Sequence, residues 1–290
     1  MVRRHPIGLG QAAKLCGMSM ATRCAFLAEG LPVILDSAEG FWSGSQALKD
    51  HPREADVLEG FACEEAAKVL ILVDMMRCPR RERDRHVGKA VRWFYDHLAR
   101  LLYTEVVGWR PITKADLRDY VDRHRRSHEV DGPVGEYILP AGPVHEREQR
   151  LYADIMAYEE GEPMWNTPSS WRAGTSFTSL GRAPDVLRLV QSMKRLGLFT
   201  ADGLAATADV WGREELTDAM VHYQRVTVTQ ALLLRVQDKG LIQEDASDED
   251  VDCLYRNWPF PMWDFDLRLI EVPLEDLEAE RDENLWWEMN

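Results

Sequence analysis

The segment RWFYDH places an arginine, Arg92, five positions before a histidine, His97. A histidine titrates near neutral pH, so His97 can accept or donate a proton during a reaction. Arg92 stays charged at physiological pH and can hold a phosphate as negative charge develops on it. The two side chains therefore suit metal-independent cleavage of a phosphodiester, with His97 as the acid or base and Arg92 as the phosphate ligand.

The spacing of this pair does not by itself identify a catalytic site, because the surrounding segment is rich in arginine. Two other pairs have the same spacing, Arg81 with His86 and Arg123 with His128. Five residues rotate a regular helix by about 140° beyond a full turn. Arg92 and His97 therefore share a face only if the helix is irregular, or they meet in a site shared by two copies of the chain.

Three further charges lie in FACEEAAKVLILVDMM, residues 61 to 76, which reads as a helix buried almost all round. Glu64 and Lys68 have the i, i+4 spacing of a surface ion pair, which is one interpretation. The other is that the helix is central in a bundle, with Glu64, Glu65 and Lys68 facing a polar pocket or an interface. In that case the acids are available to orient His97 or Arg92, since a buried carboxylate needs partners.

The helix expected around His97 also has an ordinary structural interpretation. Arg92, Asp96 and Arg100 are spaced as an i, i+4 ladder of surface ion pairs. The apolar face of this helix is expected to consist of Ala90, Trp93, Phe94, Leu98 and Leu101. His97 falls between Trp93 and Leu101 on that face, so the same interpretation makes it a core histidine with satisfied hydrogen bonds.

Taken together, these patterns resemble a known family. A long first helix, an EExxK helix and a helix with FxxHxxK-like character are similar to the abortive-infection AbiV family, within the HEPN superfamily of helical bundles. The residues are Glu64, Glu65 and Lys68 in the first pattern and Phe94, His97 and Arg100 in the second. The resemblance covers residues 19 to 160. Arg100 stands where the pattern has lysine, which keeps the charge and changes the hydrogen-bond geometry.

The resemblance implies a defence-associated, anti-phage endoribonuclease toxin that works without a metal and arrests growth. HEPN nucleases also use an arginine followed after four to six residues by a histidine, a pattern that Arg92 and His97 resemble. The resemblance therefore implies His97 and Arg92 as catalytic residues, supported by Glu64, Glu65, Lys68 and Arg100. The implied partners are RNA as substrate, a second copy in a homodimer, and an antitoxin or phage protein. The competing expectation is a non-catalytic helical binding protein that arrests phage or host growth by holding RNA, a nucleotide or a phage protein.

Helical periodicity and helix-ending residues predict an all-α fold, a HEPN-like helical bundle with a helical C-terminal extension. Helices are expected at 19–49, 53–77, 83–107, 113–128, 145–160, 184–197, 201–211, 213–239 and 247–257, with a loop or linker at 129–144. The expected organisation is a bundle at 1–160, a linker or loop at 161–182, a helical region at 183–270 and an acidic tail at 271–290.

Charge is distributed unevenly in this chain of 290 residues with net charge −14. Residues 77 to 128 hold fourteen Lys or Arg against seven Asp or Glu, a net +7, which leaves −21 on the remainder. The last twenty residues hold eight acids and one arginine. We name residues 77–128 the basic segment, and one hypothesis is that the acidic tail lies over it and competes with RNA, or binds an inhibitory partner.

Other features of the sequence argue against metal, cofactor and membrane-bound classes of protein. The five cysteines form no CxxC pair, and no histidine and carboxylate set has the spacing of a helical metal site, so neither a zinc site nor another cofactor is expected. No apolar run is long enough for a membrane helix or a secretory signal. The protein is therefore expected in the cytoplasm, with no membrane partner.

Overall fold

The structure is a computed structural model and describes residues 13–140, 142–156, 162–169 and 181–289. It is predominantly helical, as the sequence predicts, with 11 α-helices and two small sheets in these residues. The first helices are α2 (Met20–Ala47), α3 (Pro52–Arg77), α4 (Arg83–Tyr95), α5 (His97–Gly108), α6 (Lys114–His124) and α7 (Gly142–Leu151). The later ones are α8 (Asp185–Arg195), α9 (Ala201–Trp211), α10 (His222–Asp238), α11 (Asp248–Asn257) and α12 (Leu274–Met289).

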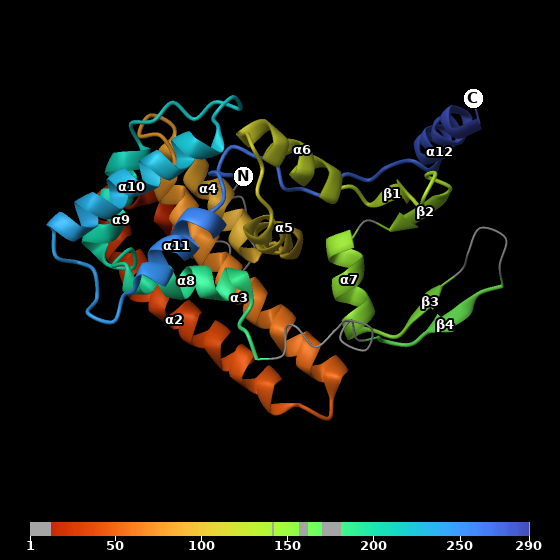
Figure 1. Ribbon diagram of the computed structural model, residues 1–290, viewed down its shortest axis with the longest axis horizontal. Helices are drawn as coiled ribbons and strands as arrows, with labels where there is room; N and C mark the ends of the chain where they lie inside the picture. Colours follow the sequence, from red (N-terminus) through yellow and green to blue (C-terminus); the bar gives the residue numbers. More distant parts are fainter. Residues whose placement is uncertain (1–12, 141, 157–161, 170–180, 290) are drawn as a thin grey trace, which may run out of the picture.

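Helix α3 is the central element of the bundle. A short turn joins it to α2, and the two long helices lie side by side (Figure 1). Pro52 suits its first turn, because proline needs no hydrogen bond there. Helices α4, α5, α7, α8 and α9 also contact α3, and every residue from Val69 to Arg77 is buried. The charges of α3 therefore lie in a helix that is surrounded by other helices.

The prediction of a single helix at 83–107 is wrong, because the helix is interrupted at Asp96. This residue has extended backbone angles, φ −88° and ψ 126°, and separates α4 from α5. Its carboxylate accepts a hydrogen bond from the backbone N–H of Ala99 at 2.9 Å, which caps the start of α5. Aspartate is among the best residues for this role, so a local capping signal overrides the longer apolar periodicity.

Two β-hairpins interrupt the helical pattern where loops and helix were expected. Strands β1 (His128–Asp131) and β2 (Tyr137–Pro140) pair antiparallel within the expected linker at 129–144. The expected helix 145–160 ends at Leu151, and β3 (Asp154–Met156) pairs with β4 (Met164–Asn166). Residues 157–161 and 170–180 lie outside the described residues, so the domain boundaries at 160 and 182 remain predictions.

The C-terminal helices share one core with the N-terminal ones. Arg77 of α3 is fully buried, with its guanidinium carbon 4.1 Å and 4.2 Å from the ring centroids of Trp211 and Trp258. Its neighbour Asp74 accepts hydrogen bonds from Arg77 (2.9 Å), Tyr103 (2.8 Å) and the backbone N–H of Met262 (2.7 Å). These contacts join the middle of the bundle to segments near residue 260.

The C-terminal region differs from expectation in two places. The helix expected at 213–239 begins only at His222, as α10, and the acidic tail forms α12. Helix α12 contacts the β1–β2 hairpin and lies apart from the bundle (Figure 1). None of the helices within the described ranges is long and apolar enough to span a membrane.

Candidate functional site

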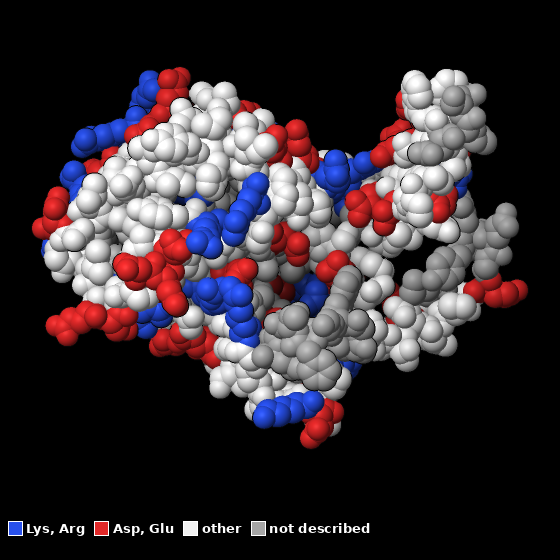
Figure 2. All heavy atoms as spheres, in the orientation of Figure 1, with Lys and Arg blue, Asp and Glu red and all other residues white. Residues whose placement is uncertain are grey.

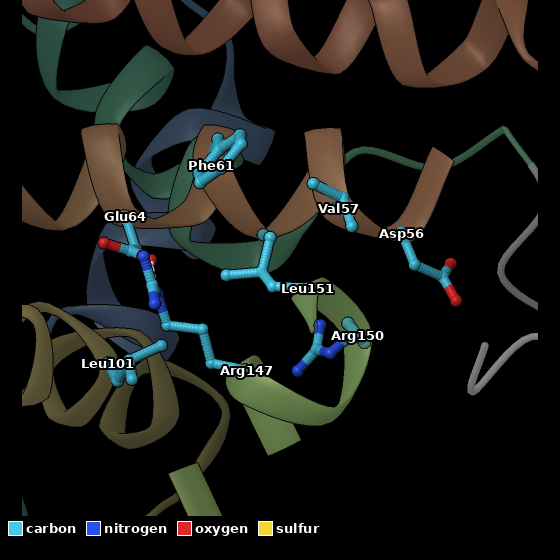
Figure 3. Close-up of a pocket in the computed structure, with 9 residues that line it drawn as sticks. Asp56, Val57, Phe61, Glu64, Leu101, Arg147, Arg150 and Leu151 are labelled. Carbon is cyan, nitrogen blue, oxygen red and sulfur yellow. Dashed lines mark hydrogen bonds and ion pairs between the residues drawn. The ribbon is translucent and has the colours of Figure 1, made fainter. Parts of the chain in front are cut away.

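Glu64 is the centre of a polar cluster joining three helices. Its side chain is 4% exposed. It accepts a hydrogen bond from Arg147 Nε of α7 at 2.7 Å, and its second oxygen lies 2.8 Å from His97 Nδ1 of α5. Arg100 Nη1, also on α5, lies 3.2 Å from that second oxygen. Glu64 and Arg147 point toward one another from facing helices (Figure 3). We call Glu64, His97, Arg100 and Arg147 the Glu64 cluster.

The partners of Glu64 keep it ionised. Burial raises the pKa of this carboxyl, but the hydrogen bonds from Arg147 and His97 and the charge of Arg100 outweigh burial, so the pKa lies below its ordinary value. An ionised carboxylate can only accept hydrogen bonds, so His97 must donate its Nδ1–H to Glu64. Arg100 Nη2 also lies 3.0 Å from Nδ1, but Nδ1 carries a hydrogen in this tautomer and a guanidinium only donates, so this contact is not a hydrogen bond.

This arrangement leaves the other nitrogen of His97 available for chemistry. The His97 side chain is 54% exposed, and its Nε2 has no hydrogen-bond partner within the part of the chain that the structure describes. With Nδ1–H held by Glu64, the neutral ring presents the lone pair of Nε2 to solvent. A carboxylate that fixes the tautomer of an exposed histidine is an arrangement suited to general acid–base catalysis.

The helix break at Asp96 explains the exposure of His97. Asp96 ends α4 and caps α5, so His97 is the first residue of α5 and does not continue the apolar face of α4. The interpretation of His97 as a core histidine is therefore wrong. The expected ladder of ion pairs is wrong as well, because Asp96 binds the Ala99 N–H while Arg100 pairs with Glu64.

Arg92 and His97 are close in sequence, but the structure records no contact between them. Arg92 is exposed on α4 and forms no ion pair or hydrogen bond with any described residue. Within the described residues nothing occupies its guanidinium, which is therefore available to an anion. The side chain of Arg100, by contrast, is only 10% exposed, and its guanidinium forms an ion pair with Glu64. Of the two arginines that flank His97, only Arg92 is available for a phosphate.

Glu65 and Lys68 form a second, separate pair on α3. Lys68 Nζ donates to Glu65, and it also lies 5.4 Å from the ring centroid of Phe94. The surface pair expected between Glu64 and Lys68 is wrong, because Glu64 turns toward α5 and α7 instead. Lys68 contacts Phe94 of α4 and Glu65 contacts Lys68, so any support they give to His97 is indirect.

The other two arginine–histidine matches have different surroundings. His86 packs edge-on against Trp263, with ring centroids 4.6 Å apart, and lies 3.5 Å from Glu82. Burial and the charge of Lys89 lower its pKa, which disfavours the cationic ring. His128 is exposed at the start of β1, where Nδ1 lies 3.2 Å from Ser127 Oγ. Neither histidine contacts a carboxylate that is buried like Glu64.

Arg147 belongs to the cluster and was not among the expected site residues. It is separated from Glu64 by 83 positions, and no spacing rule connects an arginine of α7 with a glutamate of α3. Arg147 and Glu64 line a small, shallow hollow, open to solvent, between α3, α5 and α7. The only sequence signal was the arginine-rich segment HEREQR in a predicted helix, which is common on solvated surfaces.

The basic segment does not form one continuous basic surface. Five of its cations pair with acids from outside the segment, namely Arg77 with Asp74, Arg100 with Glu64, Lys114 with Asp264, Arg118 with Asp218 and Arg126 with Glu280. Figure 2 shows acidic and basic side chains interspersed over the visible face. The excess of acids elsewhere in the chain thus neutralises much of the segment after folding.

Replacing Glu64 by glutamine is expected to lower the free energy of unfolding by about 2 to 3 kcal/mol at pH 7, because Arg147 and Arg100 lose their buried counter-charge. Since the folded-state pKa of Glu64 is depressed, its stabilising effect is present above the unfolded-state pKa and is lost as pH falls through the folded value. Urea denaturation across acidic and neutral pH measures this difference, which should shrink on acidification.

The matched control for this prediction is Glu65→Gln in the same helix. Its side chain is 20% exposed and pairs only with Lys68, so we expect a loss below about 1 kcal/mol. Equal losses from the two variants at pH 7, or a Glu64→Gln effect that grows on acidification, would contradict the role given to the Glu64 cluster.

Comparison with known proteins assigns neither a family nor a function to the chain. No family model matches the chain, and no match was found among curated proteins or solved structures. Within the described residues, no three His, Cys, Asp or Glu side chains are grouped to hold a metal ion.

Proposed function

We propose that this protein is a metal-independent endoribonuclease of HEPN type that acts as a growth-arresting toxin in anti-phage defence. His97 Nε2 takes the 2′-hydroxyl proton or protonates the leaving 5′-oxygen, and Arg92 binds the scissile phosphate. Glu64 holds the tautomer and orientation of His97. Arg100 and Arg147 keep Glu64 ionised and in place. The defence role and the family rest on the resemblance of the EExxK and FxxH patterns.

The observation that carries this proposal is the hydrogen bond between buried Glu64 and exposed His97, 2.8 Å long. Glutamate and histidine lie on different helices, so the pair is not a by-product of helical spacing. Burying a carboxylate costs several kcal/mol in general, and a histidine without a catalytic task gains little from such a partner. Because the buried carboxylate keeps an exposed imidazole in one tautomer, the arrangement favours a role in proton transfer.

The second candidate is a non-catalytic binding protein that holds RNA, a nucleotide or a phage protein. The absence of any contact between Arg92 and His97 among the described residues favours this candidate within a single copy of the chain. In the nuclease proposal, a homodimer brings Arg92 of one copy to His97 of the other. The two candidates therefore differ in whether assembly creates a cleaving site.

The experiment that tests the proposal is incubation of the purified full-length protein with a mixed RNA pool in EDTA. We expect defined cleavage products whose yield is unaffected by the chelator. RNA binding without cleavage, measured by gel shift alongside the cleavage assay, would support the binding protein instead. Absence of both binding and cleavage would reject both roles for RNA.

The acidic tail provides a separate prediction about RNA affinity. Glu280 of α12 lies 2.7 Å from Arg126, at the end of the basic segment. If the tail competes with RNA there, deleting residues 271–290 will raise RNA affinity severalfold at low salt and less at high salt, because exposed charges are screened. Fluorescence anisotropy with a labelled RNA measures the change.

A milder variant separates this competition from general damage to the hairpin. Glu280→Gln breaks the contact with Arg126 and leaves the rest of α12 in place, so it should raise RNA affinity in the same direction by a smaller factor. Unchanged RNA affinity in both variants would remove the tail from any role in RNA binding.

A further inference from the structure

A second polar hollow lies away from the Glu64 cluster, where the start of α2, the start of α4 and the end of α9 come together. Its volume is about 1080 Å³ including the open mouth. Four arginines line it, Arg23, Arg80, Arg83 and Arg213, against two acids, Asp84 and Asp209. The lining contains no aromatic side chain. The hollow is therefore a cationic pocket rather than a surface for stacking bases.

The two acids compensate little of this charge. Asp209 pairs with Arg235, which is not in the lining, at 3.1 Å. Asp84 lies 3.3 Å from Arg23, but its side chain is 87% exposed, so water screens the attraction. Arg80 and Arg213 are exposed and form no ion pair with any described residue. The hollow thus keeps an excess of positive charge after folding.

Arg83 is the strongest sign that an anion belongs in the hollow. The residue is 7% exposed, and its Nη2 donates to the carbonyl oxygens of Cys78 and Ala208, each at 2.9 Å. Its Nε has no hydrogen-bond partner, and no carboxylate among the described residues forms an ion pair with it. A buried cation without a counter-ion is costly, and burial lowers its pKa accordingly. A bound anion would offset that cost.

The first turn of α2 adds to the same field. Ser19 and Met20, at the start of this 28-residue helix, line the hollow, and the first turn contains no acidic residue. The Ser19 hydroxyl accepts a hydrogen bond from the Thr22 N–H, but no carboxylate of the first turn compensates the positive end of the helix dipole. Gly212, at the end of α9, also lines the hollow, and a Cβ there would lie 2.8 Å from Arg83 Nη2, so glycine leaves room for the buried guanidinium.

We propose that this hollow binds a multiply charged phosphate group, either as free diphosphate or as the diphosphate of a nucleotide. Arginine forks match the oxygens of such groups, and helix N-termini favour them. The lack of aromatic lining means that the phosphates and not a base are recognised. The inference is independent of the proposed nuclease, because none of its residues belongs to the Glu64 cluster.

Isothermal titration of the full-length protein with pyrophosphate, at constant ionic strength, tests this site. Arg80→Gln and Arg213→Gln should each weaken pyrophosphate binding by about tenfold, the effect of losing one charge-assisted hydrogen bond. Both arginines are exposed, so these variants should fold normally. Arg81→Gln is the matched control, because Arg81 is exposed beside Arg80 but does not line the hollow, and it should leave binding unchanged.

ADP and adenosine distinguish the two sources of the phosphate group. ADP that binds more tightly than pyrophosphate, with adenosine silent and the same sensitivity to Arg80→Gln, indicates a nucleotide, and ADP no tighter than pyrophosphate indicates free diphosphate. Three results would overturn the site. They are no pyrophosphate binding by the wild type up to about 1 mM, equal weakening by Arg81→Gln, and ADP binding that Arg80→Gln leaves unchanged.

Discussion

His97→Ala should lower the rate of RNA cleavage in EDTA by about 10²- to 10⁴-fold, the usual contribution of a positioned acid or base. The loss is expected in the chemical step, because the exposed ring of His97 contributes little to packing. Arg92→Ala should cost about 10²-fold, since it removes a charge that stabilises the phosphate as the bond breaks. Single-turnover cleavage of a labelled RNA measures both, after circular dichroism and size-exclusion chromatography show that the variants fold and assemble like the wild type.

Arg81→Ala is the control for charge alone. It removes another exposed arginine from the same basic segment and tests the competing match with His86. Cleavage should stay within about twofold of wild type if Arg92 is the phosphate ligand. Equal cleavage by wild type, His97→Ala and Arg92→Ala would show that the activity belongs to another site or to a contaminant.

Mixing the two inactive variants tests whether a homodimer shares the site. A mixed dimer of Arg92→Ala and His97→Ala contains one site with both residues intact, if each site takes Arg92 from one copy and His97 from the other. Random reassortment should then restore about a quarter of wild-type cleavage. A site within one chain gives no recovery, because neither variant holds both residues.

Asp74→Ala should produce the largest loss of stability, about 3 to 5 kcal/mol, because it leaves Arg77 as a fully buried cation without its carboxylate. Burial lowers the pKa of Arg77 to about 10 and raises the pKa of Asp74, so keeping both groups charged is costly. Their pairing offsets this cost, together with the hydrogen bonds that Asp74 accepts from Tyr103 and Met262. Chemical denaturation at pH 7, followed by tryptophan fluorescence and circular dichroism, measures the change.

Two comparisons show whether the loss comes from the buried charge. Asp122→Ala breaks an ion pair of the same i, i+3 spacing, Asp122 with Arg125, but on the surface, and should cost below about 1 kcal/mol. Replacing both buried partners, as in Asp74→Leu with Arg77→Met, removes both charges and should cost less than Asp74→Ala alone. A double variant that is less stable than the single one would contradict this explanation.

Much of the helical framework could be predicted from periodicity and helix-ending residues. The helices expected at 19–49, 53–77, 184–197, 201–211 and 247–257 are confirmed, with ends that differ by no more than two residues. These segments have apolar positions at helical spacing and end at glycine, proline or polar residues. The buried interpretation of the charged helix is also confirmed for Glu64, whose residue exposure is 3%.

The errors have identifiable physical causes. Asp96 was assigned to a surface ladder, although aspartate before HLA is also a capping residue, and only the folded geometry decides between these roles. The β1–β2 hairpin was missed because strands of four residues are too short for alternation to appear, and Gly132 and Gly135 looked like linker residues. Their positive φ angles, 109° and 68°, instead belong to the turn that joins the strands.

The site was only partly accessible from the sequence. Glu64 and His97 were named, and two partners were expected for Glu64: Lys68, four residues away at helical spacing, or His97 or Arg92 of the following helix. The structure pairs Glu64 with His97 and not with Lys68. Arg147 reaches Glu64 because α7 packs against α3. A single sequence does not show which helices pack together, so this contact could not be predicted. The closeness of Arg92 to His97 in any assembled form remains a prediction.

The position of Arg77 also has a consequence for synthesis of the chain. Arg77 donates to the carbonyl of Pro259 and Asp74 accepts from the N–H of Met262, partners 182 and 188 residues further along. A ribosome adds about 5 to 20 residues per second, so these partners follow α3 by about 10 to 40 s. During that time Arg77 and Asp74 lack these two partners in the middle of the nascent bundle. Its apolar helices are accessible to chaperones or to neighbouring nascent chains until residue 262 has emerged.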